Sequence, residues 1–383
     1  MKIASVSFHW RDDEIGGCQV PAVAFKQWCD MLHFMNGTLM KDKAGPSFEC
    51  DLVGITKSGK PYKNYVTNHP DGKYLQIRVV KEKEWATVAQ EYDFIFFGTP
   101  GPLKAKPEER AQHFKTFFEH LVKPFVIMVH GEYDLKKYYT REAVSQILDL
   151  PNCKSLAVMY TGHWGFTQKP ELAFHPCTLP QYLPGSPSWP DWTLDPARRG
   201  VVFAARFSTV KNVELLANWT HDSTFMKAVG KVDAFGKSHI YQTQKRIDEE
   251  IKPAWNHQGD SFIVYDVLKW KSLLRCYRFF WDVFGSSRFV IAEPLKRLNL
   301  SAVEAIAQGC IPIVDVNAVP DWVKAVSVHV DIKNPDVKSV AAQIDFLNAH
   351  YEKFIPMMVD ILKTSPYSFD ALKSQVEAIL GVA

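Results

Sequence analysis

A carboxylate and a closing glycine lie in a segment that changes from buried strand to short helix and back. Glu304 falls inside the expected helix, Gly309 ends it where a left-handed residue is needed, and residues 311–314 then have the length of a parallel core strand. A helix that follows a strand's carboxyl end presents unpaired N–H groups to a phosphate. A carboxylate one turn further along can accept two hydroxyl hydrogens of a ribose. The alternative is an ordinary turn with a surface glutamate.

Two further features stand at expected strand ends. His130 follows the apolar strand at residues 124–129, at the carboxyl end where α/β folds place ligand-facing groups. It is either an acid/base or hydrogen-bonding group or a structural histidine. Gly16 and Gly17 lie between the first strand and the first helix, where missing side chains let a ligand approach the backbone. Such a glycine pair also shapes ordinary turns.

A polar and basic stretch covers residues 54–81, where tyrosines are interleaved with cations and Asp71 is the one acid. The cations are Lys57, Lys60, Lys63, Lys73, Arg78 and Lys81. The stretch is either a solvated loop or hairpin, or a surface that contacts the phosphates of a nucleic acid.

The elements that must position these residues form two successive sets of strand–helix units. In the first half we expect strands at residues 3–8, 93–97, 124–129 and 156–159, and helices at 21–35 and 108–121. Residues 161–196, rich in Pro and Trp, predict an irregular connection between domains. In the second half we expect strands at residues 201–205, 231–235, 262–265, 289–291, 311–314 and 329–332, and helices at 212–219, 268–284, 337–362 and 369–380.

This alternation predicts the α/β class, with two Rossmann-like, doubly wound domains facing each other across a cleft. We expect domains at residues 1–185 and 186–365, and a last helix at 366–383 that crosses back to the first domain.

Composition limits the function classes. With 383 residues, 46% hydrophobic and 23% charged, the chain is that of a globular protein of two domains. A formal charge of +3 neither requires nor opposes nucleic-acid binding. Seven scattered cysteines without a CxxC pair indicate reduced thiols in a cytoplasm rather than disulfides or a zinc site. The N-terminus reads as a core strand and not as a signal peptide, and no apolar run approaches the roughly 20 residues that span a bilayer.

The glycine pair, the cations after the first strand of the second half and the helix that closes with a glycine together resemble the GT-B glycosyltransferases, especially their retaining branch. ARFSTVK is similar to the family's GR…K pattern, which implies that Arg206 and Lys211 bind the diphosphate of a nucleotide-sugar donor. VEAIAQGCIP is similar to the family's E-A-x-A-x-G-x-P pattern, which implies that Glu304 binds the ribose. The residues implied to lie around the donor phosphates are Lys296, Asn299, Leu300 and Ser301. Lys296 stands where the family often has a first glutamate.

Short segments across most of the chain also resemble the α-glucosyltransferases of T-even phages, which glucosylate hydroxymethylcytosine in DNA. These segments are GGCQV with its following helix, RFSTVK before an aromatic-rich helix, Lys296 in place of a glutamate, and His130 at a strand end. One departure is that the phage enzymes have an Asp directly after this His, whereas here Gly131 precedes Glu132.

The resemblance implies transfer of a sugar, glucose or a pentose such as arabinose, from a UDP-sugar to 5-hydroxymethylcytosine in double-stranded DNA, with retention and base flipping. Arg206 and Lys211 would stabilise the leaving diphosphate without a divalent metal, and His130 would polarise the sugar or position the hydroxyl. No cofactor beyond the UDP-sugar and no membrane are implied, and the expected protein is a monomer in the cytoplasm of an infected bacterium. Two alternatives stay open: a GT-B transferase with a small-molecule, lipid-linked or polysaccharide acceptor, and an inactive DNA- or nucleotide-binding GT-B scaffold.

Overall fold

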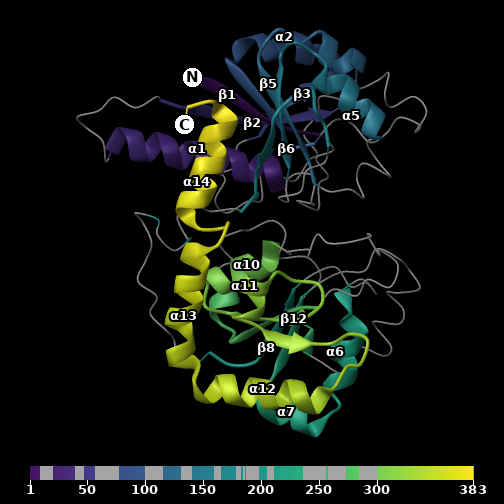
Figure 1. The fold of residues 1–383 in the computed structure, drawn as a ribbon, viewed down its shortest axis with the longest axis vertical. Coiled ribbons are helices and arrows are strands. Elements are labelled where there is room, and N and C mark those ends of the chain that lie inside the picture. Colours follow the sequence, from purple (N-terminus) through teal and green to yellow (C-terminus); the bar gives the residue numbers. More distant parts are fainter. Residues whose placement is uncertain are drawn as a thin grey trace. The chain divides into compact units, whose positions relative to one another are not determined.

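The computed structural model describes residues 1–8, 20–38, 47–56, 77–99, 115–130, 140–158, 165–177, 183, 186, 198–204, 211–235, 256–257, 273–283 and 300–382. The chain divides into two compact units (Figure 1). Unit 1 comprises Met1–Gln181 and Phe369–Ala383, and unit 2 comprises Tyr182–Ser368.

The described part of unit 1 is built on a sheet of seven parallel strands in the order β3-β2-β1-β4-β5-β6-β7. The strands are β1 Lys2–Phe8, β2 Glu49–Thr56, β3 Ile77–Lys81, β4 Phe94–Phe97, β5 Phe125–Val129, β6 Cys153–Val158 and β7 Glu171–Ala173. The central strands β4 and β5 are buried along their whole length, because helices cover both faces of a doubly wound sheet. The side on which successive strands are added to the sheet changes between β1 and β4, and this is the topological switch point of a Rossmann-like fold.

The helices of unit 1 pack aromatic side chains onto this sheet. Among the described residues they include α1 Val20–Thr38, α2 Trp85–Val88, α5 Arg141–Leu148 and α14 Phe369–Leu380. On one face the buried ring of Phe97 contacts Phe118 with the ring centroids 4.8 Å apart and Trp85 at 6.0 Å, both edge to face. On the other face Phe25 of α1 stacks on Phe96 at 4.1 Å. Bulky rings thus fill both layers of this core.

The last helix, α14, belongs to unit 1 although it is far from the rest of that unit in sequence. Figure 1 shows α14 crossing α1, and the ring of Phe369 lies 5.2 Å from that of Trp28. The oxygen of the Gln375 side chain accepts hydrogen bonds from both the backbone N–H and the ring Nδ1 of His175, each at 3.0 Å. Burial lowers the pKa of His175.

From the lowered pKa of His175 we predict that the stability of unit 1 depends on pH. The pKa of an unfolded histidine is about 6.5 and the folded value is lower, so the stabilising contribution of His175 is complete above about pH 6.5 and is lost as the pH falls towards the folded pKa. We expect thermal unfolding of unit 1 at pH 5.5 to occur below its midpoint at pH 7.5, by about 2–4 °C for each kcal/mol lost. A His175→Asn variant should lack this part of the pH dependence. An unchanged slope in the variant would assign the effect to other groups.

The described part of unit 2 repeats the topology with six parallel strands in the order β10-β9-β8-β11-β12-β13. The strands are β8 Val201–Ala204, β9 Val232–Phe235, β10 Asn256–His257, β11 Phe279–Asp282, β12 Ile311–Asp315 and β13 Val328–Val330. Taken in chain order this is the Rossmann order, with the switch point between β8 and β11. The predicted fold class, α/β with two Rossmann-like doubly wound parts, is therefore confirmed.

The helices in the described part of unit 2 include α6 Val213–Trp219, α7 Ser223–Val229, α10 Leu300–Ala307, α11 Asp321–Lys324, α12 Val337–Ala349 and α13 Tyr351–Thr364. Asp222 begins α7 by accepting hydrogen bonds from two backbone N–H groups, and Asp336 begins α12 in the same way. In Figure 1 α7 and α12 lie side by side at the end of unit 2.

One predicted helix is wrong. Residues 268–284 were expected to be helical, but the structure places the central strand β11 at Phe279–Asp282. Leu273, Tyr277, Phe280 and Phe284 recur at helical spacing, and that pattern favoured a helix. Phe279, Phe280 and Trp281 are instead a continuous apolar run, which is what a strand buried on both faces contains.

Three smaller expectations also need correction. The ends of the basic stretch at residues 54–81 belong to β2 and β3, which pair in parallel, so the stretch is not a hairpin. The segment 161–196 contains β7, an edge strand of the first sheet. The helix expected at residues 337–362 is two helices that meet at His350, whose backbone is not helical. The strands expected at residues 262–265 and 289–291 lie outside the described residues.

Candidate functional site

Two of the predicted donor-binding segments reach the carboxyl edge of the second sheet. Lys211 lies just before α6, in the connection that follows β8, and α10 begins after β11. Since β8 and β11 are neighbouring parallel strands, the start of α6 and the start of α10 lie at the same edge, on either side of the switch point. Open α/β sheets bind ligands at this place.

The helix α10 carries Ser301 and Glu304, both half-buried. Its C-terminus has the predicted form, because Gly309 has a φ of 72°. Cys310 N–H donates to the carbonyl of Ala305 and Gly309 N–H to that of Ile306, which is the Schellman arrangement. The prediction that Gly309 ends this helix is confirmed.

Two further contacts fix the end of α10. The guanidinium of the buried Arg198 donates to the carbonyl of Gln308 at 2.7 Å, and the hydroxyl of Tyr351 donates to the carbonyl of Gly309 at 2.6 Å. A cation at the C-terminal end of a helix interacts favourably with the helix dipole. The helix that bears Glu304 is therefore held firmly at the end away from the site.

Sequence reasoning missed two buried carboxylates at the same edge. Asp282 ends β11 and Asp315 ends the neighbouring strand β12, and each is 5% exposed. Burial raises the pKa of Asp315, although its carboxylate accepts hydrogen bonds from the backbone N–H and side chain of Asn317. The signal was available, because a charged residue that directly follows an apolar core strand sits at the ligand-binding edge.

In unit 1 the corresponding edge carries His130, directly after β5. Its ring Nε2 lies 2.8 Å from the carbonyl oxygen of Gly98, which follows β4. A carbonyl only accepts, so Nε2 carries a hydrogen and donates it to Gly98. Gly98 itself is held by the carbonyl of Val6, and a Cβ added to it would come within 3.0 Å of the Ala22 nitrogen. The imidazole thus stands at the carboxyl edge in a fixed orientation.

Arg78 lies at the amino end of β3 and belongs to a different environment. Its guanidinium donates two hydrogen bonds to the carboxylate of Glu91, at 2.5 and 2.8 Å, and a third to the hydroxyl of Tyr92. The ion pair raises the pKa of Arg78 and lowers that of Glu91. Because Glu91 and Tyr92 precede β4, this cluster is at the edge opposite His130. The structure therefore favours a structural role for Arg78.

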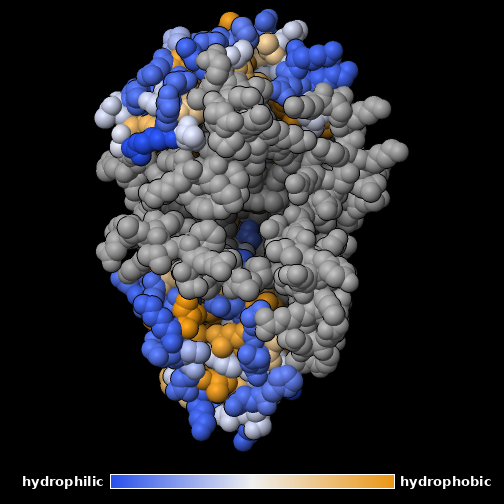
Figure 2. All heavy atoms as spheres, turned by 90° about the vertical axis from the view of Figure 1, so that its right-hand side faces the viewer, coloured by the Kyte–Doolittle hydropathy of each residue, from blue (hydrophilic) through white to orange (hydrophobic). Residues whose placement is uncertain are grey.

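The other predicted site residues lie outside the described residues: Gly16, Gly17, Lys57, Lys60, Lys63, Lys73, Arg206, Lys296 and Asn299, together with the side chain of Leu300. Within the described ranges no group of three or more His, Cys, Asp or Glu side chains could hold a metal ion. No helix among the described residues is long and apolar enough to cross a membrane. Hydrophilic residues predominate over the coloured part of the face in Figure 2.

No protein-family model matches the sequence, and a search of curated proteins finds no significant match. Solved structures do match. T4 phage BGT, of which a mutant is known with UDP-glucose, has a TM-score of 0.54 at 9% identity, with 99% of each chain covered. AviGT4, a glycosyltransferase involved in avilamycin A biosynthesis, has a TM-score of 0.51 at 13% identity, covering 100% of this chain and 98% of its own.

A third match is the α,α-trehalose 6-phosphate synthase of Burkholderia multivorans, with a TM-score of 0.51 at 10% identity over 100% of this chain and 99% of its own. These matches extend over the whole chain and agree with the two Rossmann-like sheets. The chain has the GT-B fold.

Proposed function

We propose that this protein is a glycosyltransferase that uses a UDP-sugar and has no cofactor beyond it. The observation that carries the proposal is the placement of Lys211 and the start of α10 on either side of the switch point of the second sheet. A cation and a helix N-terminus at one edge suit a diphosphate, and Glu304 one turn along α10 suits a ribose. Two of the matching structures, of T4 phage BGT, contain UDP-glucose or UDP with Mn²⁺.

The reaction breaks the bond between the sugar's anomeric carbon and the diphosphate oxygen and forms one to an acceptor hydroxyl oxygen. Negative charge develops on the diphosphate, and Arg206 and Lys211 stabilise it together with Ser301 and the neighbouring Lys296, Asn299 and Leu300. In a transfer with retention the acceptor attacks on the face from which UDP departs, and its proton passes to the leaving phosphate. His130 positions that hydroxyl or polarises the sugar, while Gly16 and Gly17 let the donor approach the backbone.

We propose that the acceptor is 5-hydroxymethylcytosine in double-stranded DNA and that the sugar is glucose or a pentose such as arabinose. The sequence resemblance to the phage enzymes and the lysines of residues 57–76 support this acceptor. The target base would be flipped out of the duplex to reach His130. Such an enzyme acts as a monomer in the cytoplasm of an infected bacterium.

A second candidate keeps the donor site and replaces DNA by a small molecule or polysaccharide. The match to AviGT4, a protein of avilamycin A biosynthesis, favours it as much as the match to T4 phage BGT favours the first. An inactive nucleotide-binding scaffold is the third candidate. Two measurements test the enzyme proposal. One is calorimetry of UDP binding, and the other is an assay of UDP release from UDP-sugars, each made with and without a chelator. Binding without turnover on any acceptor would leave only the scaffold.

The DNA surface gives a separate prediction. Replacing Lys57, Lys60, Lys63 and Lys73 by alanine together should weaken binding of duplex DNA and reduce the slope of log affinity against log salt by about 0.9 per lost phosphate contact. Arg78→Ala is the matched control, because its charge is already paired with Glu91. Equal losses in the two variants, or none in either, would place the DNA surface elsewhere.

A further inference from the structure

The backbone of Lys211 is held from the neighbouring strand. The indole Nε1 of Trp281, in β11, donates a hydrogen bond of 3.3 Å to the carbonyl oxygen of Lys211. Side chains alternate along a strand, so the buried Trp281 ring lies on the face of the sheet opposite Phe280, which packs with Ala305 of α10. This bond ties the chain that follows β8 to the end of β11.

The next residue has an unusual backbone. Asn212 has a φ of 45° and a ψ of 37°, and it is the one non-glycine residue with a positive φ among those described. Left-handed backbone costs free energy in any residue with a Cβ, least in asparagine, and it tends to be kept at functional sites. The Asn212 side chain also makes a long hydrogen bond of 3.5 Å to the carbonyl of Val283, directly after β11. The turn therefore has two attachments to the same strand.

The helix that follows completes the arrangement. Trp219, in the last turn of α6, packs edge to face on Trp281 with ring centroids 5.6 Å apart, and Phe225 of α7 lies 5.5 Å from Trp219. Both tryptophans are buried. The indole that bonds to the backbone of Lys211, just before α6, is thus itself packed against the end of α6.

We propose that Trp281 and Asn212 are positioning residues that determine where the ammonium group of Lys211 meets the donor diphosphate. This inference rests on the proposed function and adds to it two residues that make their contribution through Lys211. A lysine ammonium is a point charge on a flexible four-carbon chain, so it is placed only as well as its backbone is. A displacement of about 1 Å in a catalytic group can cost about 100-fold in rate.

A double-mutant cycle tests the proposal on the full chain. Trp281→Phe keeps most of the ring and removes the N–H donor; we expect it to lower kcat about 10-fold and to leave the acceptor KM unchanged. In a Lys211→Ala background the same change should have almost no further effect on kcat or on the Kd of UDP. The matched control is Trp85→Phe, because the buried indole N–H of Trp85 has no hydrogen-bond partner among the described residues.

The backbone part of the proposal has its own pair of variants. Asn212→Gly adopts left-handed backbone freely and should keep kcat within about 3-fold, whereas Asn212→Ala is strained there and should lose about 10-fold. Amide hydrogen exchange of residues 211–216 should rise in Trp281→Phe and in Asn212→Ala but not in Asn212→Gly.

Three results would overturn the inference while the proposed function stood. The first is the same fold-loss of kcat from Trp281→Phe in the wild-type and in the Lys211→Ala background. The second is a loss of kcat from Trp85→Phe as large as that from Trp281→Phe, and the third is a lower kcat for Asn212→Gly than for Asn212→Ala. A wild-type chain that binds no UDP and releases none from UDP-sugars would overturn the proposed function and this inference with it.

Discussion

Replacing Lys211 by alanine is expected to lower the rate of sugar transfer by about 100-fold or more while leaving DNA affinity nearly unchanged. The reason is that Lys211 is proposed to bind the diphosphate, which carries two negative charges in the bound UDP-sugar and gains another as the bond to the sugar breaks, so the loss of the cation should raise the barrier and appear in kcat. Arg206→Ala should behave in the same way, since the two cations are proposed to share that charge. Steady-state kinetics with a UDP-sugar and hydroxymethylated DNA provide the measurement.

Lys227→Ala is the control for charge. Lys227 lies in the last turn of α7, which leads into the start of β9, so it is exposed at the amino edge of the same sheet. Its loss should leave kcat within a factor of about 2, because isolated surface charges contribute little. Turnover close to the wild-type value in both Lys211→Ala and Arg206→Ala would mean that the donor site is misplaced.

Replacing Phe97 by alanine is expected to destabilise unit 1 by about 3–5 kcal/mol, because removing a buried aromatic ring eliminates its packing contacts and leaves a cavity. Phe97 is fully buried at the end of β4, and its ring meets those of Phe118, Trp85 and Phe125. Differential scanning calorimetry should show the transition of unit 1 shifted to lower temperature.

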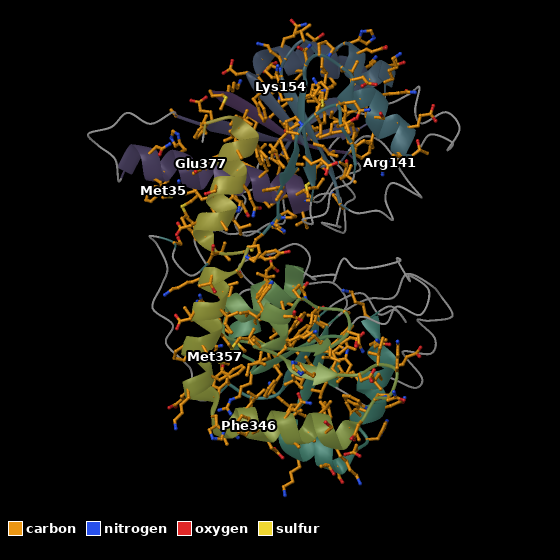
Figure 3. The ribbon with its side chains drawn as sticks, viewed as in Figure 1. Met35, Arg141, Lys154, Phe346, Met357 and Glu377 are labelled. Carbon is orange, nitrogen blue, oxygen red and sulfur yellow. The ribbon has the colours of Figure 1, made fainter. Side chains whose placement is uncertain are left out.

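Phe346→Ala is the matched control for this loss of a ring. Phe346 lies on α12 of unit 2 and is 62% exposed (Figure 3). We expect its removal to change the unfolding free energy by less than about 0.5 kcal/mol. A similar shift from both substitutions would show that the aromatic layer around Phe97 does not stabilise unit 1 as the packing indicates.

The sequence predicts most of this fold because buried parallel strands are short, apolar and bounded. Residues 311–314 became β12 and residues 124–129 became β5 for that reason. The sequence pattern is misleading at β11, where aromatic residues recur at helical spacing and only the pairing with β8 and β12 decides the conformation. The pattern also does not reveal β7, whose three residues gain their structure from pairing with β6.

The sequence allows the residue types of the candidate site to be predicted, but not the contacts that hold those residues in place. Lys211, Glu304 and His130 could be chosen because each stands near an expected strand end or helix start. The hydrogen bond from Trp281 to Lys211 joins residues 70 positions apart, and no local sequence pattern predicts it. Arg78 was grouped with the lysines of residues 57–73 by composition, whereas the structure pairs it with Glu91. Composition alone does not distinguish a cation that binds a ligand from one that is paired with a carboxylate of the same chain, as Arg78 is with Glu91.

Mass spectrometry of nucleosides tests the proposed sugar transfer to a hydroxymethylated base most directly. Hydroxymethylated and unmodified duplex DNA would each be incubated with the protein and a panel of UDP-sugars, then digested. We expect a gain of one hexose or one pentose residue on hydroxymethylcytosine alone, and no gain with the Lys211→Ala variant. No gain on any base, while UDP is still released from a UDP-sugar, would contradict the DNA acceptor and favour a small-molecule or polysaccharide acceptor at the same donor site.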